Sequence, residues 1–169
     1  MSELPAILRG LPLDHVAIAV ADLEAASTPY LLLGLESGVD ELLPEQGVRV
    51  RMLQAAGSRI ELIEPTGPQT PVARFLERRG PGLHHVALRV RSLDSEVERL
   101  IEEGARFTQP APTAGHAGSR VIFLHPSWTG GVLLELVEHK LVEHKLVEHG
   151  LAAQRASSAP EGSETRDDA

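Results

Sequence analysis

Two histidines stand in nearly the same surroundings at two places in the chain. LDHVAIAV carries His15 and LHHVALRV carries His85, at a constant offset of 70 (85 minus 15). The alternation in both stretches predicts a strand, and each histidine then shares a face with the alanine two positions further on. His84 has no twin, because Asp14 stands opposite it, so we expect His84 to point away from His85 and to play a structural part.

Two glutamates recur in the same way on later strand-like stretches. Glu61 lies in RIELIEP and Glu135 in LLELVEH, at an offset of 74 (135 minus 61). Each copy therefore supplies one histidine and, 46 or 50 residues later, one glutamate (61 minus 15, 135 minus 85). If the copies pair around a twofold axis, two imidazoles and two carboxylates meet in one concavity and can bind a divalent cation. Thiolate ligands are excluded, since the chain contains no cysteine.

A single histidine at the start of a strand is more often a hydrogen-bonded core residue, and a single glutamate is usually solvated. That interpretation would suit either copy taken alone. A duplicated scaffold could, however, keep its apolar alternation while losing both polar positions. The recurrence of both residue types therefore favours the metal site.

The elements that must position these residues also repeat. Helix-like stretches follow the two histidine strands, beginning at Asp22 and Ser92, which suit an N-cap, and ending at Gly34 and Gly104. Pro29 weakens the first helix. The strand-like runs GVRVRMLQ and RVIFLH precede the two glutamate strands. We therefore predict two paired modules around a shared concavity, each with one strand, one helix and about three further strands, and PVARFLERRG as a short helix between them.

Length and composition limit the possible classes of protein. With 169 residues, 42% of them hydrophobic, the chain suits one domain with an aliphatic core. It has no apolar run long enough to cross a bilayer and no secretory signal at its start, so a cytoplasmic protein is expected. A net charge of −8 disfavours nucleic acid as a partner. Arginines concentrated in mid-chain still allow a small anionic ligand.

The order and spacing of these motifs resemble the vicinal oxygen chelate superfamily, which includes glyoxalase I, extradiol dioxygenases and bleomycin-resistance proteins. LDHVAIAVADLE, LPEQGVRV, SRIELIEP, ARFLERRGPGLHHVALRV and RVIFLHPSWTGGVLLELVE are most similar to the methylmalonyl-CoA epimerase family. The resemblance implies an α+β fold in which two paired βαβββ modules form a cupped mixed sheet. It assigns the domain to residues 11–138, with modules at 13–64 and 83–138 and a linker at 65–82. It also implies a divalent cation, Co²⁺ first and Mn²⁺, Ni²⁺ or Zn²⁺ as alternatives. Carried over by position, its ligands are His15, Glu61, His85 and Glu135.

That family interconverts (2R)- and (2S)-methylmalonyl-CoA through an enolate, and the resemblance implies the same isomerase reaction here. Epimerisation is simplest with two opposed bases, and by position these are Glu45 in PEQGVRV and Glu135, which is also a ligand. Some epimerases have Gln in place of Glu61, so the additional anion should tighten cation binding. The resemblance further implies an acyl-CoA substrate and a homodimer. Candidates for contacts with the CoA nucleotide are Arg78, Arg79 and Arg120.

Two alternatives stay open. The same four ligands occur in bacterial glyoxalase I (lactoylglutathione lyase), whose substrate is a hemithioacetal of glutathione, although Glu45 and the HPSWTGG stretch favour the epimerase. A non-catalytic small-molecule binding protein of the same fold would not need all four ligand positions. An extradiol dioxygenase would need two histidines and one carboxylate with open positions, and the second carboxylate disfavours it.

The C-terminal part departs from the resemblance. LVEHKLVEHKLVEHG repeats with a period of five residues, which fits neither one face of a helix nor one face of a strand. Residues 139–169 are therefore expected to form a solvated repeat extension and a disordered tail. His139, His144 and His149 could bind metal adventitiously there, but catalysis is not expected to depend on the repeat.

Overall fold

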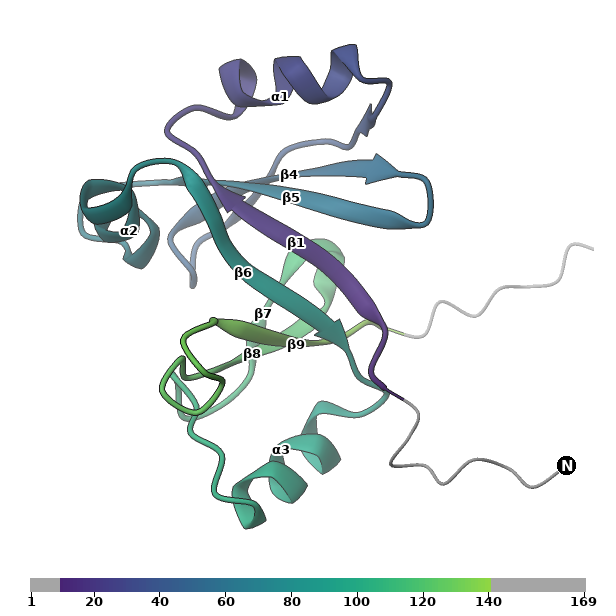
Figure 1. Cartoon of the computed structure of the whole chain (residues 1–169), viewed down its shortest axis with the longest axis vertical. Helices are drawn as coiled ribbons and strands as arrows, with labels where there is room; N and C mark the ends of the chain where they lie inside the picture. Colours follow the sequence, from purple (N-terminus) through teal and green to yellow (C-terminus); the bar gives the residue numbers. More distant parts are fainter. Residues whose placement is uncertain (1–9, 141–169) are drawn as a thin grey trace, which may run out of the picture.

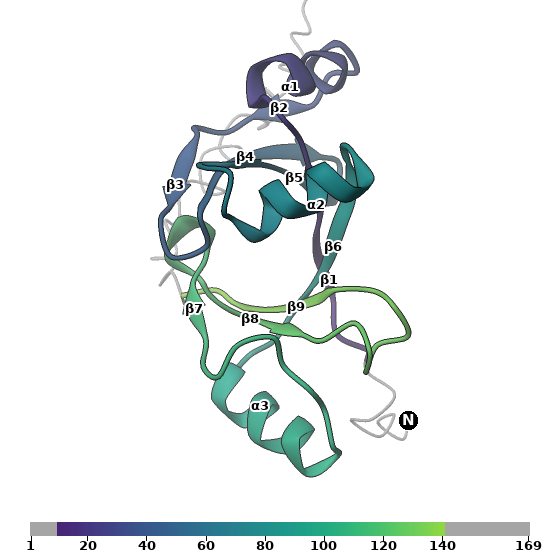
Figure 2. The same cartoon turned by 90° about the vertical axis from the view of Figure 1, so that its left-hand side faces the viewer.

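One curled sheet dominates the protein, as a computed structural model shows for residues 10–140, the part of the chain that it describes (Figure 1). The strands within those residues are β1 (Leu13–Ala19), β2 (Glu36–Ser37), β3 (Glu41–Leu43), β4 (Val48–Ala55), β5 (Ser58–Pro65), β6 (Gly82–Arg89), β7 (Thr113–Ala114), β8 (Arg120–Leu124) and β9 (Leu134–Glu138). The helices are α1 (Leu23–Leu32), α2 (Pro71–Arg79) and α3 (Leu93–Glu102), with a short 3-10 turn, η2 (His116–Gly118), before β8. Figure 2 shows the sheet curving into a cup, with α1 and α3 at opposite ends of the molecule.

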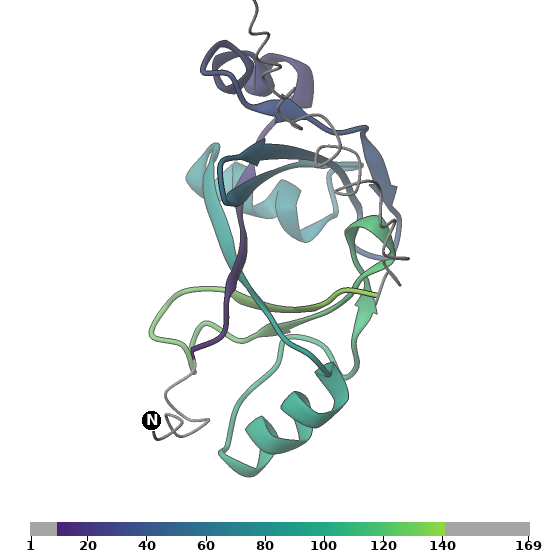
Figure 3. The ribbon, with the colours of Figure 1, turned by 90° about the vertical axis from the view of Figure 1, so that its right-hand side faces the viewer.

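The two modules meet in the middle of the sheet, where β1 pairs antiparallel with β6 (Figure 3). The strand order is β2-β4-β5-β1-β6-β9-β8-β7, and β3 pairs with β4. Val16 faces Val86. On one side of this pair His15 faces Ala87, and on the other side His85 faces Ala17. The pairing is therefore symmetric about the two valines, as the repeat predicts.

The closing strands keep the same symmetry. β5 runs parallel to β1, and β9 runs parallel to β6. Glu61 lies beside Ala17, and Glu135 lies beside Ala87. Each of these alanines follows the histidine of its module by two positions. Each module thus sets its histidine and its glutamate on adjacent strands in equivalent registers.

Helices α1 and α3 cover the outer face of the sheet through equivalent apolar clusters. Leu23 of α1 packs with Leu62 of β5, and Leu93 of α3 packs with Leu136 of β9, all four fully buried. Because side chains alternate along a strand, the residue before each strand leucine points to the inner face. That residue is a glutamate in both modules.

The helix starts follow the sequence closely. Asp22 and Ser92 each accept a hydrogen bond from a backbone N–H in the first turn, so both predicted N-caps are confirmed. A second acceptor was not predicted: the first residue of α1 donates its N–H to Glu64, and that of α3 donates to Glu138. A carboxylate there also complements the helix dipole. Helix α1 continues through Pro29 without ending.

The α+β cupped mixed sheet that the resemblance implies is confirmed, and so is the short helix that the sequence predicts between the modules. The first module has one strand more than predicted, because the stretch before β4 forms both β2 and β3. No helix in residues 10–140 is long and apolar enough to cross a membrane. The second and third copies of the VEHK repeat, with the tail, lie outside the described residues.

Candidate metal centre

The two histidines and two glutamates of the repeat come together on the inner face, on the neighbouring strands β5, β1, β6 and β9. All four residues are at most 6% exposed. His15 Nε2 lies 3.4 Å from Glu61 Oε2 and 3.3 Å from Glu135 Oε2. His85 Nε2 lies 3.8 Å and 3.6 Å from the same two oxygens. Both modules therefore contribute equally to one cluster.

The spacing of these atoms suits a first-row divalent cation. Four ligands arranged tetrahedrally with bonds of about 2.0–2.3 Å are separated from one another by roughly 3.3–3.8 Å. Within the described chain, the Nε2 atoms of His15 and His85 and the Oε2 atom of Glu135 are buried without a hydrogen bond. Unsatisfied buried polar atoms are costly, and a cation would satisfy all three together. The residues present therefore fit a metal ion.

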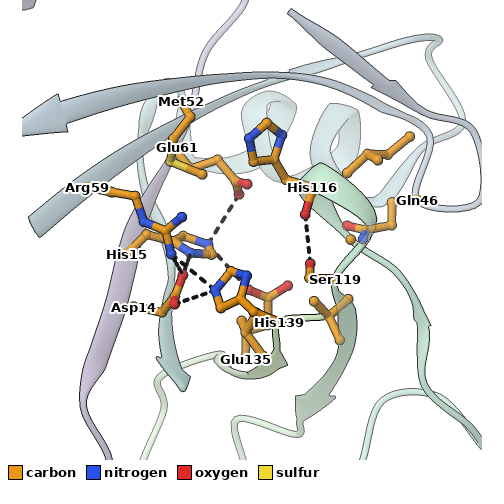
Figure 4. Close-up of a pocket in the computed structure, with 14 residues that line it drawn as sticks. Asp14, His15, Gln46, Met52, Arg59, Glu61, His116, Ser119, Glu135 and His139 are labelled. Atoms are coloured by element: carbon orange, nitrogen blue, oxygen red, sulfur yellow. Dashed lines mark hydrogen bonds and ion pairs between the residues drawn. The ribbon is translucent and has the colours of Figure 1, made fainter. Parts of the chain in front are cut away.

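Asp14 supports His15 from the side away from the cluster. Its carboxylate lies 2.9 Å from His15 Nδ1, and it also contacts Arg59, Arg89 and His139. Figure 4 shows Arg59 and His139 converging on Asp14 beside His15. Burial raises the pKa of Asp14, but its hydrogen bonds to His15, His139 and Arg89 outweigh burial and hold this pKa well below the usual range. A carboxylate on Nδ1 fixes the imidazole tautomer and leaves Nε2 free to bind a metal.

The buried carboxylates give the cluster a negative potential. Burial alone would lower the pKa of His15, but its hydrogen bond with Asp14 and the nearby carboxylates of Glu135 and Glu61 raise it to about 11. Burial raises the pKa of Glu135, yet the adjacent imidazoles of His15 and His85 bring it below the ordinary value. In the metal-free protein a proton on the imidazole thus balances part of the carboxylate charge, and a divalent cation can take its place.

The expectation that His84 points away from His85 is wrong. The pairing of β6 with β1 passes from His85 directly to Leu83, which leaves His84 as an extra residue at a β-bulge. His84 Nδ1 consequently lies 2.9 Å from His85 Nδ1. The pairing of β1 skips Asp14 in the same way, immediately before His15. In each module a bulge therefore turns the residue before the histidine toward that histidine's Nδ1.

Two larger cavities reach the cluster at His85. One, of about 410 Å³, is lined by Glu45, His84 and His85 and otherwise largely by apolar residues. The other, of about 540 Å³, shares His84 and His85 with the first and extends to Arg78 and Arg79. Their volumes fall in the range of small-molecule sites. The histidine pair thus lies where the two cavities meet.

Glu45 lies in the turn between β3 and β4, exposed at the edge of the first cavity. Its Oε2 accepts a hydrogen bond from the backbone N–H of Ala114, at 3.4 Å. Gln46 Nε2 donates to the carbonyl oxygen of the same residue, at 2.8 Å. Nearby, Glu41 pairs with His116 at 2.6 Å. These contacts join the two modules across the cup, and no feature of the sequence indicated them.

The three arginines that are candidates for contacts with the CoA nucleotide lie in different places in the structure. Arg78 and Arg79, at the end of α2, line the larger cavity. Arg120 lines neither of the two cavities beside the histidines and instead forms an ion pair of 2.7 Å with Asp94. Only the first two lie where they could meet a ligand in these cavities.

Comparison with known proteins agrees with this arrangement. Residues 14–123 match the glyoxalase/bleomycin resistance protein/dioxygenase superfamily. The chain therefore belongs to this superfamily.

Among known proteins the chain is similar to methylmalonyl-CoA epimerases. It is 42% identical to the ethylmalonyl-CoA/methylmalonyl-CoA epimerase of Cereibacter sphaeroides, over 73% of this chain and 95% of the relative. The crystal structure of methylmalonyl-CoA epimerase from Mycobacterium tuberculosis is 41% identical, with a TM-score of 0.73, and the match covers 76% of this chain and 87% of that one. A methylmalonyl-CoA epimerase in complex with methylmalonyl-CoA and NH₄⁺ is 36% identical, with a TM-score of 0.73 and coverage of 78% and 96%.

Proposed function

We propose that this protein is a metal-dependent methylmalonyl-CoA epimerase, an isomerase that interconverts the (2R) and (2S) forms of its substrate. The observation that carries the proposal is the buried cluster of two histidines and two glutamates beside a cavity edged by Glu45. Relatives and solved structures named for this activity, at about 40% identity, support the substrate class.

The reaction requires a proton to leave one face of C2 and return on the other. The hydrogen between the thioester and the carboxylate is only weakly acidic, so an enolate must be stabilised. A divalent cation held by His15, Glu61, His85 and Glu135 would supply Lewis acidity toward the thioester oxygen. Glu45 at the cavity edge is proposed to hold or release the proton on one side, and Glu135 on the other.

Other features of the proposal follow from the resemblance. Co²⁺ is the proposed metal, with Mn²⁺, Ni²⁺ or Zn²⁺ as alternatives, since nitrogen and oxygen ligands accept each of them. We propose a homodimer that acts in the cytoplasm. Arg78 and Arg79 are proposed to contact the CoA nucleotide, because they line the cavity that leads away from the cluster.

The test combines metal analysis with isotope exchange. Purified protein should be stripped with chelator, reloaded with one cation at a time, and incubated in D₂O with (2R)- or (2S)-methylmalonyl-CoA. Metal-dependent incorporation of deuterium at C2 with loss of optical purity is expected. Efficient turnover of the glutathione hemithioacetal instead would assign the protein to glyoxalase I. Binding of small molecules with neither reaction would leave the non-catalytic alternative.

A further inference from the structure

His84 is the residue before a candidate ligand, as Asp14 is, but the two differ in what surrounds them. Asp14 is 2% exposed, and its carboxylate contacts Arg59, Arg89 and His139 in addition to His15. His84 is half-buried, and its ring packs edge-on against Phe75, with 4.9 Å between the ring centroids. His84, at the position equivalent to Asp14, therefore has a second ring nitrogen, Nε2, that can bind a ligand.

A metal bound at His85 would decide where the protons of the two histidines lie. With 2.9 Å between the Nδ1 atoms, one of them must donate and the other accept. His85 turns Nε2 toward the carboxylates of the cluster, where a metal would need its lone pair. His85 Nδ1 then carries the hydrogen and donates it to His84 Nδ1. A neutral His84 that accepts at Nδ1 carries its own hydrogen on Nε2.

That Nε2–H has no acceptor among residues 10–140, since the hydrogen bond to His85 uses only the Nδ1 side of the ring. His84 lines both cavities, and around it the shared walls include the apolar Pro71 and Leu133. A donor in a largely apolar cavity is a recognition element for an oxygen of the ligand, because such sites orient ligands through a few placed polar groups.

We propose that His84 is a substrate-binding residue that donates a hydrogen bond from Nε2 to an oxygen of the acyl group, while its Nδ1 orients His85. This inference rests on the proposed function, because it takes an acyl-CoA as the ligand. The acceptor is either the thioester carbonyl or the free carboxylate, both of which present an oxygen lone pair. The repeat has thus diverged: Asp14 serves the metal site alone, whereas His84 serves the metal site and the substrate.

Two variants separate the two tasks. His84→Asn keeps an acceptor near the position of Nδ1 but removes the distant donor. His84→Phe keeps an aromatic ring against Phe75 and removes both nitrogens. His125→Asn is the matched control, because His125 lines neither cavity and its side chain, within residues 10–140, hydrogen-bonds only to Ser127.

The readouts are Co²⁺ affinity from its absorption spectrum and the Kd of the metal-loaded protein for methylmalonyl-CoA and for propionyl-CoA, which lacks the carboxylate. We expect His84→Phe to weaken Co²⁺ binding about 10- to 100-fold. We expect His84→Asn to keep Co²⁺ affinity within a few-fold and to weaken acyl-CoA binding about 10-fold or more. Equal losses for both ligands assign the contact to the thioester oxygen, and a loss confined to methylmalonyl-CoA assigns it to the carboxylate.

The outcomes for His84 and for the proposed function are distinguishable. If the wild type binds and epimerises methylmalonyl-CoA while His84→Asn matches it in Kd and KM, the inference about His84 is overturned and the proposed function stands. If the wild type binds acyl-CoA without epimerising it, the binding comparison still decides the role of His84. A wild type that binds neither acyl-CoA overturns both.

Discussion

Strand alternation in the sequence does not predict the position of the residue before each histidine of the cluster. His15, Glu61, His85 and Glu135 could be predicted because each recurs at a constant offset, and the structure brings all four together. Strand alternation assigns the preceding residue to the opposite face, and on that basis His84 was placed wrongly. A β-bulge breaks the alternation, and bulges depend on the pairing of two strands rather than on the residues of one.

At the same scale, Glu45 can be tested without disturbing the metal. Glu45→Gln keeps the shape of the side chain and removes a proton acceptor at the edge of the cavity. Because a positioned base contributes about 10²- to 10⁴-fold, kcat for epimerisation should fall by roughly that factor while Co²⁺ affinity stays unchanged. Deuterium exchange should survive from only one epimer. Glu36→Gln, an exposed carboxylate on β2, is the control, and unchanged epimerisation in Glu45→Gln would remove Glu45 from the mechanism.

The raised pKa of His15 predicts how cation binding depends on pH. With that pKa at about 11, the metal-free protein holds a proton on His15 throughout the neutral range, and the cation must displace it. Below that pKa, each unit of increasing pH should raise the apparent affinity for Co²⁺ about tenfold, from pH 6 through pH 8. An imidazole with an ordinary pKa of about 6.5 would give a plateau above neutral pH. Co²⁺ titrations at three pH values, with proton release measured by calorimetry, distinguish the two, and a plateau would contradict the prediction.

At the scale of elements, the end of β9 connects the repeat extension to the candidate metal centre. β9 ends at Glu138, where the resemblance also places the end of the domain. His139, the next residue, lies with Nε2 2.7 Å from Asp14 and 3.2 Å from Arg59 Nη2, and its side chain is only one-third exposed. The first copy of the VEHK repeat therefore contributes a side chain to the support of His15, which its five-residue period did not indicate.

Two truncations test that contact. A chain that ends at Lys140 keeps His139, so its Co²⁺ affinity and turnover should equal those of the full chain. A chain that ends at Glu138 lacks the hydrogen bond to Asp14, and we expect Co²⁺ affinity to fall about tenfold, as for other groups that support a metal ligand. His139→Ala in the full chain should reproduce the shorter truncation. Loss of activity in the chain that ends at Lys140 would show that residues beyond it take part in catalysis.

At the scale of the whole molecule, the duplication explains why so much of the fold follows from the sequence. Two copies of one module predicted the order of the elements, their caps and the shared concavity. The repeat could not show that β1 lies beside β6. Which strands become neighbours depends on the packing of the whole sheet, whose outer face is covered by α1 and α3. Nor could it show the contacts of Glu41 and Gln46 with the loop of the other module, which have no counterpart in the repeat.

The same arrangement makes cation binding a property of the folded molecule as a whole. The four candidate ligands come from strands of both modules, so an unfolded chain cannot present them together. Binding to the native state alone stabilises it by about 4 kcal/mol at a free cation concentration of 1,000 times Kd, which for a chain of this size raises Tm by roughly 8–16 °C. Thermal unfolding of chelator-treated protein, with and without Co²⁺, measures the shift.

Mg²⁺ at the same concentration is the control for this measurement, because it prefers oxygen ligands in octahedral geometry and should shift Tm far less. His15→Gln should lose most of the Co²⁺ response. If Tm does not respond to Co²⁺, Mn²⁺, Ni²⁺ or Zn²⁺, the buried cluster is not a metal site and the unpaired Nε2 atoms need another partner.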